Sequence, residues 1–441
     1  MLELRVNSVL ANISANGDEN LPATFESWVR SRSLRTLGTN AGSDALAFQG
    51  WRRFKEAFAP ELIARAVREC DRPVVRCFDP FGGSGTTALA CQFLGVDPVT
   101  IEVNPYLADL IEAKLSEYSL DSLAKDAGNV IDLARNAEAN NNSLKLICGP
   151  RTLVEPGVDG KWVFDKAVAD NIFNLLNSIN SVNDENNRRL FKIILGGQLS
   201  DLSNVRISGK GRRYRGGWRS RPVAADRVFS AFVESLTHAV HDIALHRNRA
   251  SKCYDLRRGD ARRLVRDIEP VDLVVFSPPY PNSFDYTDVY NLELWMLGYL
   301  QESIDNVNLR HATLTSHVQL RRLYPAAPTV STLLTNVLER LEGRRSELWH
   351  RDIPAMVGGY FADLTEILSN LQSKLNPGGR IYMIVGDSQY AGVPIPVAEI
   401  LVELAKNLGF EVLDTEASRS MRASAQQGGA AILPETLLVL T

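Results

Sequence analysis

PVVRCFDPFGGSGTTALACQFLGVDPVTIEVN, residues 73–104, is the stretch that decides the fold class. Its first apolar run is predicted to be a buried strand that ends at Pro80, because proline lacks the donor that a strand ladder needs. A helix is predicted after the glycines, and a second strand is predicted to end near Glu102. Further helices are predicted on both sides, over residues 54–70 and 105–118. This alternation is typical of a doubly wound α/β sheet.

The alternation stops twice further along the chain. It is interrupted between about residues 120 and 255 and again from about 281 to 355, and it returns over 355–441. The simplest architecture is therefore one doubly wound sheet that carries two largely helical insertions.

The composition is that of a globular protein. The chain has 441 residues, of which 45% are hydrophobic and 23% are charged. Its formal net charge of -3 gives no global sign of nucleic-acid binding, so such a partner must be argued from local patches. No signal peptide and no apolar run of about 18 residues is found, so we expect a cytoplasmic protein with no membrane partner. The five cysteines form no CxxC pair, and no metal site is predicted.

A glycine turn joins the first predicted strand to its helix. Gly82, Gly83 and Gly85 would let the backbone approach a ligand that a Cβ would push away. Glu102 lies 19 residues after Gly83, where a carboxylate can accept both ribose hydroxyls of a nucleoside. A P-loop is excluded because the turn has no lysine. A dinucleotide site stays open, since Ala88 completes GxGxxA, and so does a plain sheet turn.

Two further segments carry polar groups at expected strand ends. Asp260 follows what should be the third core strand and is a candidate acceptor for an adenine amino group. The run VDLVVFSPPY, residues 271–280, ends a buried strand in two prolines. Ser277 Oγ and the carbonyl before Pro279 can accept hydrogen bonds from an exocyclic base amine and so favour its nucleophilic form. Tyr280 can stack on a base that has left the duplex.

Such a site suits methyl transfer from a sulfonium donor, because positioning supplies most of the acceleration. DPFGGSGTT, residues 79–87, together with SPPY, residues 277–280, resembles the S-adenosylmethionine-dependent DNA amino-methyltransferases, which modify the N4 of cytosine or the N6 of adenine. The resemblance implies a Rossmann-like methyltransferase sheet and S-adenosylmethionine as cofactor. The cofactor-binding residues that it implies are Phe58, Asp79, Pro80, Gly83, Gly85, Thr86, Glu102 and Asp260, and the catalytic ones are Ser277, Pro278, Pro279 and Tyr280.

The target base follows from the first residue of the quartet. In this family Ser is usual in cytosine-N4 enzymes and Asp or Asn in adenine enzymes, so Ser277 favours cytosine. A cytosine-C5 mechanism is excluded because no cysteine follows Cys253. An adenine-N6 DNA enzyme, an RNA base-amine enzyme and a catalytically silent DNA-binding subunit stay open as alternatives. The resemblance implies DNA as partner, in a restriction-modification or phage-defence system with a cognate restriction or defence protein.

Two segments are candidates for binding the nucleic acid. VRISGKGRRYRGGWRSR, residues 205–221, has no acidic residue and is predicted to contact phosphates, although a solvated charged surface is the alternative. Its basic residues are Arg206, Lys210, Arg212, Arg213, Arg215, Arg219 and Arg221. LRHATLTSHVQLRRLYP, residues 309–325, is the second candidate, and either segment could read bases.

These assignments predict six regions. They are an N-terminal extension (1–45), the cofactor-binding half of the methyltransferase domain (46–120), a candidate DNA-binding insertion (121–254), the catalytic loop region (255–290), a second helical insertion for target recognition (291–354) and the C-terminal half of the sheet (355–441).

Overall fold

The computed structural model describes most of the chain. The described residues are 23–30, 32, 34, 36–40, 42–54, 56–137, 150–154, 156, 160–208, 211–251, 253–282, 284–422 and 432–441. Within those ranges, no helix combines the length and the apolar character that crossing a membrane requires.

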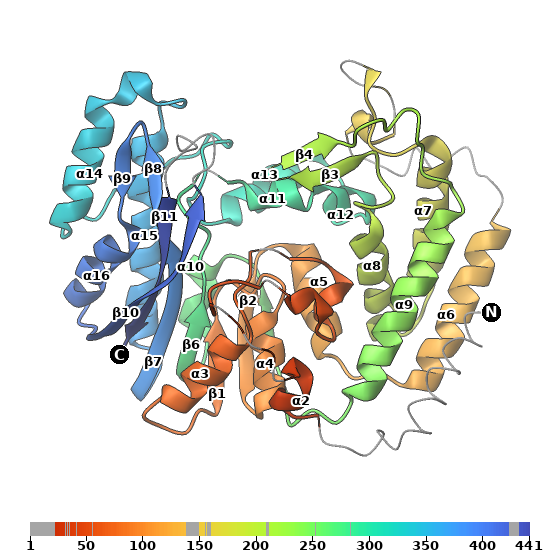
Figure 1. Cartoon of the computed structure of the whole chain (residues 1–441), viewed down its shortest axis with the longest axis horizontal. Helices are drawn as coiled ribbons and strands as arrows, with labels where there is room; N and C mark the ends of the chain where they lie inside the picture. The colour runs from red at the N-terminus through yellow and green to blue at the C-terminus, as the bar shows by residue number, and fades with distance from the viewer. Residues whose placement is uncertain are drawn as a thin grey trace.

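One mixed seven-stranded sheet organises the molecule (Figure 1). Its spatial order is β10 (Val412–Arg422), β11 (Ile432–Leu440), β7 (Leu375–Gly386), β6 (Val271–Phe276), β1 (Arg76–Asp79), β2 (Asp97–Glu102) and β5 (Asp255–Arg258). The five strands β7, β6, β1, β2 and β5 pair in parallel, whereas β11 pairs antiparallel with both β7 and β10. The predicted doubly wound α/β fold is therefore confirmed. Chain order reverses between β1 and β6, which is where such sheets bind ligands.

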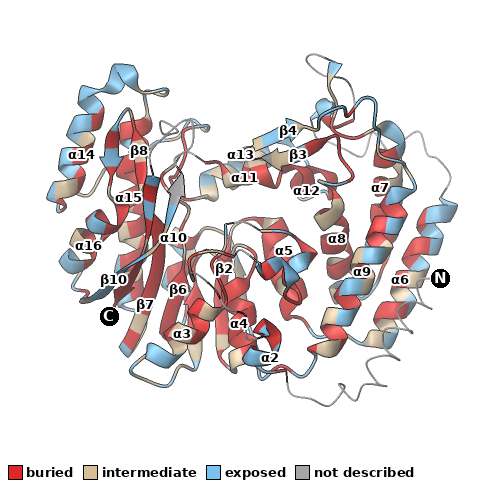
Figure 2. Ribbon diagram, in the orientation of Figure 1, coloured by how far each residue is buried: buried red, intermediate tan, exposed pale blue. Residues whose placement is uncertain are grey.

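Helices cover both faces of the sheet. One face carries α3 (Glu61–Glu69), α4 (Thr86–Leu94) and α5 (Pro105–Leu115), and the other carries α10 (Ala261–Leu264), α15 (Ile353–Gln372) and α16 (Val397–Asn407). Successive side chains of a strand point to opposite faces, so Val275 of β6 joins the first core and Phe276 joins the second. Figure 2 shows the strands as mostly buried between these helices.

The helix predicted over residues 54–70 is wrong in its first part. Helix α3 begins only at Glu61, with Pro60 as its N-cap. A proline disfavours helical geometry in the residue before it, so the chain ahead of Pro60 stays extended. It is held in place by a hydrogen bond from the Ala59 N–H to the Leu37 carbonyl, 2.9 Å long.

The first insertion packs beside the sheet. Its helices α6 (Leu120–Asn136), α7 (Lys166–Asn180), α8 (Glu185–Gln198) and α9 (Arg227–Leu245) stand together beyond α5 (Figure 1). The basic stretch lies in an insertion predicted to be largely helical, but its first part forms a hairpin of β3 (Val205–Ser208) and β4 (Gly211–Tyr214). A short helix, α2 (Phe25–Val29), precedes the sheet.

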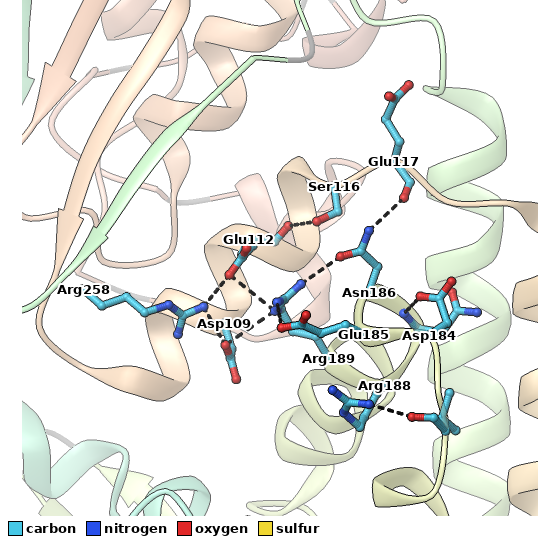
Figure 3. Close-up of polar contacts among 12 residues, drawn as sticks. Asp109, Glu112, Ser116, Glu117, Asp184, Glu185, Asn186, Arg188, Arg189 and Arg258 are labelled. Carbon is cyan, nitrogen blue, oxygen red and sulfur yellow. Dashed lines mark hydrogen bonds and ion pairs between the residues drawn. The ribbon is translucent and has the colours of Figure 1, made fainter.

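An ion-pair network fastens this insertion to the sheet edge (Figure 3). Asp109 and Glu112 of α5 lie between Arg258, at the end of β5, and Arg189 of α8. Arg258 Nη2 is 2.8 Å from Asp109 Oδ1, and Arg189 Nε is 3.4 Å from Glu112 Oε2. Two carboxylates shared by two guanidinium groups therefore fix the position of α8 against α5.

The second insertion contains α11 (Tyr286–Val289), α12 (Asn291–Met296), α13 (Ser303–Ala312) and α14 (Thr332–Gly343). A small hairpin, β8 (Ser388–Tyr390) with β9 (Val393–Ile395), packs near α14. A buried ion pair holds α12: Glu293 Oε1 lies 2.8 Å from Arg52 Nη2, and the side chains are 1% and 9% exposed.

Removing one member of that buried pair should be costly. Arg52→Met leaves the Glu293 carboxylate buried without its counter-charge, and we expect a loss of about 3 to 5 kcal/mol in the free energy of unfolding. Arg65→Met is the matched control, because the Arg65–Glu416 pair is 25% and 46% exposed and should lose only about 0 to 1 kcal/mol. Urea unfolding of both variants measures the difference. Equal small losses would contradict the prediction.

Candidate active site

A cavity of about 340 Å³ opens at the carboxyl ends of β1, β2 and β6. All four predicted catalytic residues line it, and so do all predicted cofactor-binding residues except one, Gly85. Segments far apart in the sequence thus meet at the switch point of the sheet. The second insertion closes the cavity with residues between Ala312 and His317.

The glycine turn has the backbone geometry that its sequence predicts. Gly83 and Gly85 have φ of +53° and +79°, values at which a side chain is strained. A Cβ on Gly83 would lie 3.0 Å from Phe54 Cζ, and one on Gly85 would lie 2.9 Å from Ile111 Cγ1. Gly85 is the N-cap of α4 and serves close packing, which explains why it does not face the cavity.

Glu102 ties the end of β2 to the glycine turn. Its Oε2 accepts a 2.7 Å hydrogen bond from the Gly83 N–H, and its Oε1 accepts one of 2.7 Å from the Asn104 N–H. Burial raises the pKa of this carboxyl to about 7. Only the ionised group offers both oxygens purely as acceptors, so ionisation favours hydrogen bonds from two ribose hydroxyls.

Asp79 is a second buried carboxyl in the same wall. Its Oδ1 accepts a 2.9 Å hydrogen bond from the Phe81 N–H, which shapes the turn after β1. Burial raises the pKa of Asp79 to about 6. Two acids with raised pKa values in one cavity are typical of functional sites.

Asp260 has a partner that the sequence analysis missed. It caps α10 by accepting from the Arg262 N–H at 3.0 Å, and the Arg262 guanidinium donates to both of its oxygens, at 2.9 and 2.8 Å. Arg262 also reaches Asp363 at 3.1 Å. These bonds leave the Asp260 carboxylate room for about one more donor, such as an adenine amine.

The predicted catalytic quartet, residues 277–280, is held by hydrogen bonds to two distant strands. Ser277 Oγ donates to the Ile384 carbonyl at 3.0 Å, which leaves its lone pairs for an incoming N–H. Tyr280 donates its hydroxyl to Glu435 Oε1 at 2.7 Å, and Glu435 is 1% exposed and paired with Arg419 at 2.6 Å. Burial holds the pKa of Tyr280 well above its usual value, so the phenol stays a donor.

His317 is a polar residue of the cavity that the sequence analysis left without a role. It is 1% exposed, and neither ring nitrogen has a hydrogen-bond partner among the described residues. Its Nε2 lies 3.8 Å from Asp285 Oδ2, which Arg310 Nε approaches to 2.8 Å. Burial lowers the pKa of His317 to about 4, so the ring is neutral near pH 7 and offers one donor and one acceptor.

Structure divides the predicted basic stretch into two groups. Arg206 and Arg213 face each other across the β3–β4 hairpin, and Arg212 lies beside them, opposite Ile207. These three side chains are exposed and form no ion pair with any described residue. Lys210 falls outside the described residues.

The other basic residues of the stretch differ in their surroundings. Arg215 donates to the carbonyls of Val205 and Ser200, at 3.0 and 2.9 Å, and so braces the loop before β3. Arg219 lies over the Trp218 ring and donates to the Gly160 carbonyl. Arg221 is exposed. Among the described residues of this stretch, Arg206, Arg212, Arg213 and Arg221 are therefore the cations open to a ligand.

Comparison with known proteins was made for the whole chain. No family model matches it. It is 25% identical to type II methyltransferase M.BsoBI of Geobacillus stearothermophilus, over 86% of this chain and 82% of that protein. It is 26% identical to type II methyltransferase M.AvaI of a Nostoc species, over 82% and 79%. A crystal structure of TrmN from Thermus thermophilus aligns with a TM-score of 0.28 at 11% identity, over 88% of this chain and 48% of that one. The two type II methyltransferases confirm the predicted resemblance to S-adenosylmethionine-dependent DNA methyltransferases.

Cofactor affinity should depend on the ionisation of Glu102. Because the pKa of Glu102 is about 7 and the carboxylate is a stronger acceptor of ribose hydroxyls than the neutral carboxyl, binding of S-adenosylmethionine should strengthen as pH rises through about 7. Glu102→Gln should bind more weakly and lose this pH dependence, which separates it from the titration of the ligand's own amino group. Calorimetry at several pH values measures both. A pH dependence that the variant retains would assign the effect to the ligand.

Proposed function

We propose that this chain is a DNA methyltransferase of a restriction-modification system that transfers a methyl group from S-adenosylmethionine to the N4 amine of a flipped cytosine in a specific site. The observation that carries the proposal is the shared cavity: the glycine turn after β1 and the Ser277–Tyr280 quartet after β6 line it together. The similarity to type II methyltransferases over most of the chain supports the reaction class and DNA as substrate.

The chain's own groups would act on the amine. Ser277 Oγ, whose hydrogen points to the Ile384 carbonyl, and the Pro278 carbonyl would accept the two amine hydrogens. These hydrogen bonds keep the nitrogen lone pair out of the ring and directed at the methyl group. S-adenosylmethionine would supply that methyl on a sulfonium. As the N–C bond forms, the C–S bond would break and the sulfur would keep its electron pair as a neutral thioether. The methylated nitrogen would then release one proton to solvent.

Tyr280 would orient the base rather than react with it. Its hydroxyl is anchored on the buried Glu435, which fixes the ring plane against which a base can stack. Because the phenol hydrogen is already donated to Glu435, the ring face is what the side chain can offer the base. Glu435 and Arg419 are positioning residues in this reading.

Charge on the β3–β4 hairpin supports a DNA contact close to the site. Like charges directly opposite each other on two strands are destabilising, by up to about 1 kcal/mol, so Arg206 and Arg213 gain from an anion between them. Strand β4 packs against α11, which directly follows the catalytic loop. A phosphate backbone on the hairpin would thus pass near the mouth of the cavity.

The reaction product tests the base assignment. DNA treated with enzyme and S-adenosylmethionine should yield N4-methylcytosine after digestion to nucleosides and separation by mass. Ser277→Ala should lower kcat by about 10² to 10³, because one acceptor at the reacting amine is lost, while cofactor binding is kept. N6-methyladenine as the only product would replace the base assignment. Methylated RNA alone, or no product at all, would reject DNA methylation.

Salt dependence tests the hairpin. Each phosphate contact contributes about -0.9 to the slope of log binding constant against log salt, so combined Arg206→Ala, Arg212→Ala and Arg213→Ala should flatten the slope by about 2 to 3. Arg68→Ala on α3 is the matched control, since Arg68 is exposed and lies away from the cavity. Fluorescence anisotropy over a salt series gives both slopes. Equal slopes for the triple variant and the wild type would make the hairpin an ordinary solvated surface.

A further inference from the structure

The second insertion carries an exposed leucine directly after two arginines. Leu323 is 99% exposed, the highest value for a large hydrophobic side chain among the described residues. Arg321 and Arg322 precede it directly. A single exposed leucine is ordinary on a protein surface, so its exposure alone does not indicate a binding site. Leu323 also lines a cavity together with three arginines, and this surrounding is the basis of the inference.

A second cavity adjoins the active-site cavity and shares Arg262 with it. Its lining residues are Arg262, His311, Thr315, Arg321, Arg322, Leu323 and Pro325. Arg262 also lines the active-site cavity, as do Thr313, Ser316 and His317. Segment 311–317 is therefore a partition one chain thick, with residues exposed to the active site on one side and to the second cavity on the other.

Three arginines, Arg262, Arg321 and Arg322, line the second cavity, and no acidic residue is among its lining residues. Arg262 is neutralised by Asp260 and Asp363, but Arg322 donates only to the carbonyls of Arg310 and Thr313, at 2.8 and 3.3 Å. Its Nε is buried without a partner among the described residues. Burial, with Arg262 nearby, lowers the pKa of Arg322.

Arg321 adds a second uncompensated charge at the rim. It is exposed and makes no ion pair with a described residue. An anion bound here would offset two positive charges and occupy the free Nε donor of Arg322. The chemistry fits a phosphate group.

Backbone contacts connect this charged turn to the partition. Arg322 holds the carbonyl of Thr313, Arg262 holds that of His311 at 3.0 Å, and the Thr315 N–H donates to Asp363 at 2.8 Å. The turn that presents Leu323 is thus braced against the wall of the active site. Leu323 lies only a few residues along the chain from the segment that lines the active-site cavity. A duplex that contacts Leu323 would therefore lie close to a base bound in that cavity.

We propose that Leu323 inserts into the DNA stack and fills the space left by the flipped base, while Arg321 and Arg322 bind an adjacent phosphate. The inference rests on the proposed function and assigns to Leu323 the role of keeping the duplex open after the base has flipped. Apolar side chains inserted between base steps offset the cost of unstacking, and a fully exposed leucine on a cationic turn has the required character. A protein partner for this surface is the alternative that the test decides.

The test compares two duplexes that carry the wild type's own methylated site. In one the target base faces its normal partner, and in the other it faces an abasic site, where flipping needs no wedge. Leu323→Ala should lower kcat/KM about tenfold or more on the normal duplex and leave it near the wild-type value on the abasic one. Val330→Ala, which truncates a 52% exposed side chain in the same insertion, is the matched control.

The outcomes separate the two proposals. If the wild type methylates neither duplex, the proposed function fails. If the wild type is active and Leu323→Ala matches it on the normal duplex, or is impaired equally on both, Leu323 is not a wedge. Retained S-adenosylmethionine binding shows that the variant is folded.

The phosphate contact has its own measurement. Arg321→Ala should flatten the salt dependence of DNA binding by about 0.9. An unchanged slope would overturn that half of the proposal and leave the turn available for a protein partner.

Discussion

Parallel pairing of β1 with β6 is the constraint on which the site depends. Phe78 stands opposite Val274, so both strands end at the same edge of the sheet within a few residues of this pair. The turn after one and the quartet after the other must then share a cavity, although nearly 200 residues separate them. Because β2 lies on the far side of β1, its final residue, Glu102, reaches the same edge. One pairing register thus brings the glycine turn and the Ser277–Tyr280 loop together.

This arrangement lowers the stability of the fold, because it buries the carboxyl groups of Glu102 and Asp79. Burial raises the pKa of Glu102 to about 7 and that of Asp79 to about 6, above their unfolded values. The folded state therefore binds these protons more tightly than the unfolded chain, and the resulting stability is lost as pH rises through about 6 to 7. A ligand that donates hydrogen bonds to these acids is favoured by their ionised form. The ionised form is also the one in which the empty protein is least stable.

Features that are marked by a local sequence pattern could be predicted, whereas contacts between residues far apart in the chain could not. The β1 turn, Glu102 and the Ser277 loop could be located because glycine, proline and a strand-end acid mark them within one segment. Glu435 could not, because it lies 155 residues from the Tyr280 hydroxyl that it accepts from. Arg262 reads as one more basic residue until the fold places it on Asp260. The hairpin was missed for another reason: its short, arginine-rich strands lack the apolar alternation by which strands are recognised.

The ion pairs that hold the two insertions differ in how far they are exposed to solvent. This difference affects how each insertion responds to salt. Helix α8 of the first insertion is fixed on α5 by an ionic network whose outer members, Arg258 and Glu185, are 41% and 71% exposed. The second is fixed by the buried Arg52–Glu293 pair and by Asp363, both sheltered from solvent. Salt screens exposed pairs far more than buried ones. Rising salt therefore weakens the exposed outer pairs of the α8–α5 network more than the buried Arg52–Glu293 pair.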